Sequence, residues 1–283
     1  MSKQLGFDKI DILGVDIDII TNAEALTAIM ELSAPHQPAT YIVKPYVEFL
    51  DKSYRDLEVR ELLDNAELCL ADGVALVWAA AYLYAGPRTL WRFGLSLMQI
   101  IFQPKALLYP LTSRGAGINF TLQLLEVAAQ TGRRVAVVGG PSSQSIEATA
   151  TTIRQKWPHI EIVYTHHGTD EHALKDRQST SWLSQLAGKL AAQKPDIVLL
   201  GLGFPRQEYA AAYLAAHLDH GVFIGEGGSF DYQALGGNLV KAPRWLQISG
   251  LEWLWRLLLQ PSRWRRQMAI PRFMWRVWRQ SQQ

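Results

Sequence analysis

The sequence predicts an α/β protein built on a parallel sheet flanked by helices, and three observations support this fold class. Short unbroken apolar runs recur along the chain, as at 197–200, and such runs are typical of strands buried on both faces. Segments with helical spacing separate these runs, so strand and helix alternate over 134–225. Such alternation requires right-handed crossovers between parallel strands. Glycine-rich turns follow several strands, at the sheet edge where α/β proteins bind ligands.

Local signals place the elements in order. Residues 10–20 alternate like a strand, and Thr21 and Glu24 form a capping-box pattern before the first helix. Gly86-Pro87 and Gly132 each end a later helix, and Pro205 suits the first position of another. The expected strands are 10–20, 41–43, 68–71, 134–138, 160–164, 197–200 and 221–225, and the expected helices are 22–32, 48–63, 74–84, 120–131, 143–157, 179–193 and 206–218.

Length and composition limit the class of protein. The 283 residues suit one α/β domain, expected at 1–240, with a helical appendage at 241–283. The single cysteine, Cys69, excludes an intramolecular disulfide and fits a reducing compartment. Acidic residues near the N-terminus argue against a signal peptide, and no apolar run reaches the roughly 18 residues that a membrane span needs. We therefore expect a cytoplasmic protein.

An apolar, aromatic and cationic insert interrupts the domain at about 85–112. Its composition fits a lid, a membrane-touching amphipathic hairpin or a packed surface helix.

The appendage is basic and rich in tryptophan. Between Arg244 and Arg279 it has eight arginines and one acid, Glu252, so its net charge is +7 and the rest of the chain carries about −5. Arginine and tryptophan together suit a lipid headgroup boundary. They would also suit nucleic acid, or a surface that docks on the chain's own body. Because Leu, Trp and Met fill the other helix face, we favour an anionic membrane surface over nucleic acid.

Residues at the predicted strand ends are candidates for chemistry. Asp72 follows a buried strand and precedes Gly73, where α/β enzymes place reactive carboxylates, although it could instead cap the next helix. Arg114 lies beside glycines and could pair with a diphosphate or be a surface residue. Gln207 lies in the first turn after Pro205, where a helix N-terminus favours a phosphate.

Several common site motifs are missing from the sequence. Gly201-Leu202-Gly203 lacks the third glycine of the dinucleotide fingerprint, and neither a P-loop nor a Cys/His cluster occurs. We therefore expect no nicotinamide cofactor.

Eight short motifs follow one another in the sequence. They are Ala71-Asp72-Gly73, Val138-Gly139-Gly140, Pro195-Asp196, Gly201-Leu202-Gly203, Pro205-Arg206-Gln207-Glu208, Gly227-Gly228-Ser229-Phe230-Asp231, Lys241-Ala242-Pro243 and Leu251-Glu252-Trp253-Leu254-Trp255-Arg256-Leu257. Motifs in this order resemble the WecG/TagA/CpsF family of bacterial glycosyltransferases. The likeness covers about residues 10–267, without the insert, and implies a Rossmann-like body with a C-terminal helical appendage.

The resemblance implies an inverting, metal-independent transfer of a sugar from a UDP-sugar to a polyprenyl-diphosphate-linked acceptor. The protein would act on the inner face of the cell membrane, in cell-envelope or exopolysaccharide synthesis, with no cofactor. An inverting transfer needs one base for the acceptor hydroxyl and groups that hold the departing UDP. A homo-oligomer is compatible with the sequence. The rival reading is an altered or inactive member that serves as a membrane-bound scaffold or binds nucleotide sugars.

The resemblance also assigns roles to residues. Asp72 would be the base, Arg114 would stabilise the diphosphate, and Gln207 would contact donor or acceptor. Arginines of the appendage would reach the leaving phosphates, with Arg256, Arg263 and Arg266 as candidates. Other expected substrate contacts are Gly73, Gly139, Gly140, Gly203, Pro205 and Asp231.

The chain departs from the family pattern at two places. Lys44-Pro45-Tyr46 stands where the family usually has Thr-x-Asn, and Glu226 stands where an apolar residue is usual. We expect Lys44 to meet a phosphate, Tyr46 to stack on a sugar or uracil ring, and Glu226 to read a hydroxyl group. These changes suggest an altered substrate.

Overall fold

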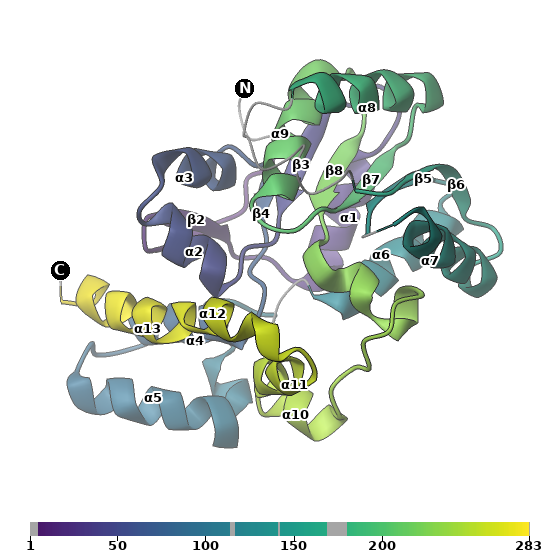
Figure 1. Ribbon diagram of the computed structural model, residues 1–283. Coiled ribbons are helices and arrows are strands. Elements are labelled where there is room, and N and C mark those ends of the chain that lie inside the picture. The colour runs from purple at the N-terminus through teal and green to yellow at the C-terminus, as the bar shows by residue number, and fades with distance from the viewer. Residues whose placement is uncertain (1–4, 114–116, 141, 169–179, 283) are drawn as a thin grey trace.

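The structure is a computed structural model that describes residues 5–113, 117–140, 142–168 and 180–282 of the 283-residue chain. It confirms the predicted α/β class: helices flank a six-stranded parallel sheet (Figure 1). The strands are β1 Lys9–Ile12, β2 Val15–Asp18, β3 Thr40–Val43, β4 Leu68–Cys69, β5 Arg134–Gly139, β6 Glu161–His166, β7 Ile197–Gly201 and β8 Val222–Gly225. The longer helices are α1 Asn22–Leu32, α2 Val47–Ser53, α3 Leu57–Asp64, α4 Val74–Tyr84, α5 Leu90–Phe102, α6 Ile118–Gln130, α7 Ser143–Lys156, α8 Thr180–Gln193, α9 Arg206–His217, α11 Glu252–Leu259 and α13 Ala269–Gln280.

The strand order of the sheet is β4-β3-β8-β7-β5-β6, and every neighbouring pair is parallel. Alternate residues of each strand therefore enter opposite halves of the core. Val198 and Leu200 of β7 belong to the half covered by α4, α8 and α9, whereas Ile197 and Leu199 belong to the half covered by α1, α6 and α7. Because the strands are parallel, the loops that follow β3, β4, β5, β7 and β8 all emerge at one edge of the sheet.

Two predicted elements differ from the structure. The strand expected at 10–20 is a hairpin of β1 and β2, because Leu13 and Gly14 turn the chain with positive φ angles of 56° and 82°. The helix expected at 48–63 is divided into α2 and α3. Asp56 begins α3 by accepting a hydrogen bond from the Val59 amide, which a continuous helix would not permit. The capping box of Thr21 and Glu24 at α1 is confirmed.

The C-terminal segment forms short helices that pack on the α/β body. These are α10 Arg244–Ile248, α11, η4 Pro261–Arg263, α12 Trp264–Gln267 and α13. Phe273 and Val277 of α13 are fully buried. Arg272 and Arg276 reach the buried Asp51 of α2, with nitrogen–oxygen distances of 2.8 and 2.6 Å. Among the residues described, no helix has the length and apolarity to span a membrane.

The insert consists of α5, which packs against α4, followed by the short 3-10 helix η1 Pro104–Leu107. The indole Nε1 of Trp78 donates a hydrogen bond of 2.8 Å to Ser96, and Phe93 packs edge-on against the rings of Trp78 and Tyr82. The guanidinium of Arg92 donates to the carbonyl oxygens of Ala81 and Tyr82 at the end of α4. The helix is therefore fixed to the body along one face.

Candidate active site

The candidate residues of four neighbouring strands meet at the C-terminal edge of the sheet. Asp72 follows β4, Lys44 follows β3, Glu226 follows β8 and Gln207 follows β7. Backbone hydrogen bonds connect these loops: the Asp72 amide donates to the Pro45 carbonyl at 2.8 Å, and the Glu226 amide donates to the Leu200 carbonyl at 2.8 Å. The order β4-β3-β8-β7 thus gathers side chains that are up to 182 positions apart in the sequence, from Lys44 to Glu226.

Asp72 does not cap the helix that follows it. Gly73 occupies the N-cap position of α4 with φ +89°, and no side chain makes a capping hydrogen bond there. The Asp72 carboxyl is partly buried, and burial is the main reason why its pKa is raised to about 6. Lys44 and Arg256 oppose this rise in pKa, whereas Glu252 and Glu226 add to it. A carboxyl with such a pKa is a base at neutral pH and can accept a proton readily.

Lys44 and Glu226 form a buried ion pair. Lys44 Nζ lies 2.7 Å from Glu226 Oε2, and the same carboxylate accepts a short hydrogen bond from Thr121 of α6. Both charged residues are almost fully buried. Glu226 therefore already neutralises the charge of Lys44, which we expected to meet a phosphate.

Gln207 links α9 to the loop that follows β8. Its amide nitrogen donates to Glu208 Oε1 at 2.8 Å, and its carbonyl oxygen accepts from the Gly227 amide at 2.8 Å. Glu208 is fully buried, and burial raises its pKa to about 7. An acid in the first turn of a helix usually complements the helix dipole from the surface, but Glu208 lies in the interior beside Gln207. Both polar ends of the Gln207 side chain are thus fixed.

Arg256 of α11 places a positive charge of the appendage near the C-terminal edge of the sheet. It lies over the ring of Tyr232, 5.1 Å from the ring centroid, and its charge lowers the pKa of Asp72. The Tyr232 hydroxyl donates a hydrogen bond of 3.2 Å to Glu252, which lies on α11 together with Arg256. The Nε atom and one terminal nitrogen of Arg256 are buried and have no hydrogen-bond partner among the described residues. Such donors would suit the oxygens of a phosphate.

The remaining predicted substrate contacts lie at the ends of β5, β7 and β8 or in the segments that follow these strands. Gly139 needs no ligand to explain it, because a Cβ there would lie 2.5 Å from the Gly201 carbonyl oxygen of the neighbouring strand. Gly140 continues that turn, Gly203 and Pro205 form the turn before α9, and Asp231 is exposed at the end of η2 Gly227–Asp231.

The structure describes the three remaining arginine candidates for phosphate binding to different extents. Arg114 lies outside the described residues, and only the backbone of Arg263 is described. Arg266 lies 3.9 Å from Glu48 of α2, and the other oxygen of that carboxylate accepts a hydrogen bond from Tyr46. Tyr46 also packs edge-on against Phe49. Arg266 and Tyr46 are therefore joined through Glu48.

Sequence reasoning missed three residues of this site. Glu252 was noted only as the lone acid of the appendage, and neither Glu208 nor Thr121 was given a role. Glu208 and Glu252 belong to the motifs of the family resemblance, which could have marked them. Thr121 has no sequence signal, because only the fold brings α6 against the end of β8.

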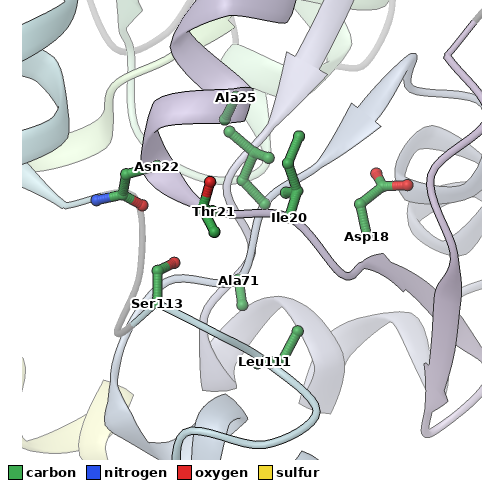
Figure 2. A pocket seen from close by; sticks show the side chains of 9 residues that line it. Asp18, Ile20, Thr21, Asn22, Ala25, Ala71, Leu111 and Ser113 are labelled. Atoms are coloured by element: carbon green, nitrogen blue, oxygen red, sulfur yellow. The ribbon is translucent and has the colours of Figure 1, made fainter.

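Two cavities of the described part of the chain have linings that do not include Asp72, Gln207 or Arg256. One is small, about 10 Å³ or roughly room for one water molecule, between Thr21 and Asn22 at the start of α1 and Ala71, Leu111 and Ser113 (Figure 2). The other is an open groove between α2–α3 and α12–α13, lined by Arg55, Arg265 and Arg272 among others. Within the described ranges, no group of three or more His, Cys, Asp or Glu side chains is arranged to hold a metal ion. That the reaction needs no metal stays a prediction.

Comparison with known proteins identifies the family. The sequence matches the glycosyl transferase WecG/TagA/CpsF family over residues 10–106 and 98–283. The chain belongs to this family. The WecG/TagA/CpsF match includes α5, which our sequence interpretation left outside the resemblance.

Two characterised relatives have the same name. The chain is 34% identical over 174 residues to N-acetylglucosaminyldiphosphoundecaprenol N-acetyl-beta-D-mannosaminyltransferase of Bacillus spizizenii, covering 62% of this chain and 63% of the relative. It is 33% identical over 163 residues to the protein of that name from Bacillus subtilis, covering 58% of this chain and 59% of the relative. The WecG/TagA/CpsF chain described here thus spans about three fifths of the length of these relatives.

Proposed function

We propose that this protein is an inverting glycosyltransferase that moves a sugar from a UDP-sugar to a polyprenyl-diphosphate-linked saccharide in cell-envelope polysaccharide synthesis. Family membership supports a glycosyl transfer, and the names of the two Bacillus relatives support a lipid-linked acceptor and an N-acetylmannosamine-like sugar. The observation that carries the proposal is the gathering of Asp72, Lys44 and Gln207 at one edge of the sheet, where burial raises the pKa of Asp72 and the charge of Arg256 lowers it.

In this proposal Asp72 accepts the proton of the acceptor hydroxyl as that oxygen attacks C1 of the donor sugar. The bond between C1 and the diphosphate oxygen breaks, and the UDP leaves with the bonding electrons. A departing diphosphate needs cationic donors that are already in place. Arg256 supplies two buried nitrogens that no described residue satisfies, and Gln207 lies fixed in the first turn of α9. Arg114, Arg263 and Arg266 are further candidates for this role.

The appendage is proposed to hold the enzyme on the anionic inner face of the cell membrane, next to its lipid-linked acceptor. Arg244, Arg265 and Arg279 are exposed, and so are Trp245 and Trp264. Truncation of the appendage is a poor test, because it would remove the fully buried Phe273 and Val277 together with Arg256. Exchange of exposed arginines for glutamine tests the same idea in a protein that keeps its core.

The test is UDP release with a panel of UDP-sugars, in the presence and absence of a polyprenyl-diphosphate–N-acetylglucosamine acceptor. We expect release that depends on both the acceptor and one preferred donor. If no donor gives release while one of them still raises the unfolding temperature, the protein is a nucleotide-sugar-binding scaffold instead. The panel also tests an altered donor, which the Lys44–Glu226 pair favours because it occupies a position where the family pattern has uncharged residues.

A further inference from the structure

Helix α5 is apolar on both faces. Its inner face packs Phe93, Leu97 and Ile100 against the core, as expected for a helix that covers α4. Its outer face is also apolar: Trp91 is 77% exposed and Phe102 is 71% exposed, and Leu90, Leu95, Met98 and Ile101 are exposed beside them. A helix that is hydrophobic all round normally lies in a core or in lipid.

The exposed apolar side chains of the molecule are concentrated in two segments. Only four of those among the described residues lie outside the insert and the appendage: Tyr54, Leu57, Tyr84 and Val240. In Figure 1, α5 and α10–α13 lie together on the lower side of the molecule, away from α8 and α9 at its upper end. Exposed patches of this kind mark interaction sites.

The two segments are in contact with each other. A Cβ atom on Gly250, in the turn between α10 and α11, would lie 3.1 Å from Ile100 Cγ2 of α5 and 2.9 Å from Val74 Cγ1 of α4. The end of α5 therefore abuts the start of α11, whose exposed side chains include Trp253, Leu254 and Leu258.

The charge around this surface selects the kind of partner. No Asp or Glu occurs between Asp72 and Glu126, and Glu252 is the one acid between Asp231 and the end of the sequence. Arginine and lysine are spread over both segments. A second copy of the chain would place this cationic surface against an identical one, whereas anionic lipid headgroups would neutralise it.

We propose that α5 is a second membrane-docking element, which inserts its outer apolar face into the headgroup and upper acyl region of an anionic bilayer beside α11. Trp91 and Phe102 lie at the two ends of the helix, so an α5 that lies in the plane of the interface would place both rings at the headgroup boundary. This inference extends the membrane part of the proposed function, and its test contains neither sugar nucleotide nor acceptor. A failure of the catalytic proposal therefore leaves it intact, and its own failure leaves the catalytic proposal intact.

The first experiment measures binding of the full chain to phosphatidylcholine vesicles with and without phosphatidylglycerol, by flotation in low and high salt. We expect the double variant Trp91→Gln/Phe102→Gln to bind vesicles at least about tenfold more weakly, because each lost side chain removes a large apolar contact. The loss should persist in high salt, where the contribution of the arginines fades. The matched control is Leu57→Gln on α3, which is 72% exposed and should bind like the native chain. Thermal unfolding checks that both variants are folded.

The second experiment places a polarity-sensitive fluorophore on Leu95→Cys or on Leu57→Cys. The native Cys69 is buried, so the label reports the new position. Vesicles should shift the emission of the α5 label to the blue and leave the α3 label unchanged. Native binding by the double variant together with an unshifted α5 label would overturn the proposal. A concentration-dependent dimer that the double variant abolishes, with unchanged vesicle binding, would also overturn it and assign the face to a second copy.

Discussion

Lys44 Nζ lies 2.7 Å from Glu226 Oε2, so the two positions at which the chain departs from the expected family pattern form one buried ion pair. Either residue alone would be a buried charge without a counter-charge, which is energetically costly. The two changes are therefore explained only as a pair. Together they place a fixed dipole between β3 and β8, within electrostatic range of Asp72.

The pair predicts strong coupling between the two positions. Lys44→Met should lower the free energy of unfolding by about 3–5 kcal/mol, because it leaves Glu226 ionised and unpaired in the interior. The double variant Lys44→Met/Glu226→Gln should recover most of this loss. Urea unfolding of the native chain, both single variants and the double variant measures the coupling. Additive effects of the single changes would contradict the account.

The same pair predicts opposite shifts in the pH profile. The ionised form of Asp72 is the proposed base, so kcat/KM should rise with pH through about 6 and then level off. Lys44 lowers the pKa of Asp72 and Glu226 raises it. The midpoint should therefore move to higher pH in Lys44→Met and to lower pH in Glu226→Gln. Movement in the same direction in both variants would show that the profile reports another group.

Glu208 predicts a pH dependence of stability. Burial raises its pKa from 4.5 to about 7, so the folded chain binds its proton more tightly than the unfolded chain. Its contribution to stability is then complete below pH 4.5 and is lost as the pH rises to about 7, by about 3 kcal/mol. Glu208→Gln has no proton to lose there. The difference in unfolding free energy between variant and native protein should grow over this range, and parallel curves would contradict the assignment.

We expect a substitution of Arg256 to impair catalysis without impairing folding. Arg256→Gln should lower kcat by about 10²–10³-fold, because it removes donors from the developing charge of the diphosphate. Arg154→Gln on α7 is the control, since that exposed arginine lies outside the cluster around Asp72. UDP release under saturating donor measures the effect. Equal activities of the two variants would remove Arg256 from the site.

The sequence predicted most of the elements but not how their side chains pair. The strands around Asp72, Gly139 and Gly225 were readable because apolar runs and glycine turns are local signals. The hairpin at Leu13-Gly14 was missed because its two halves continue the same alternation. The Lys44–Glu226 contact and the burial of Glu208 depend on which strands are neighbours in the sheet. Local sequence patterns do not predict strand order. For the insert that contains α5, the sequence left a lid, a membrane-touching hairpin and a packed surface helix open, because composition alone does not show which side chains are exposed.

The most direct test of the account is sugar transfer by Asp72→Asn, measured beside Asp16→Asn, an exposed aspartate on β2. We predict that Asp72→Asn unfolds like the native chain and still binds the donor, but transfers sugar at least about 10³-fold more slowly, because its amide cannot accept the acceptor proton. Asp16→Asn should transfer at the native rate. Native turnover by a folded Asp72→Asn protein would contradict the proposed mechanism.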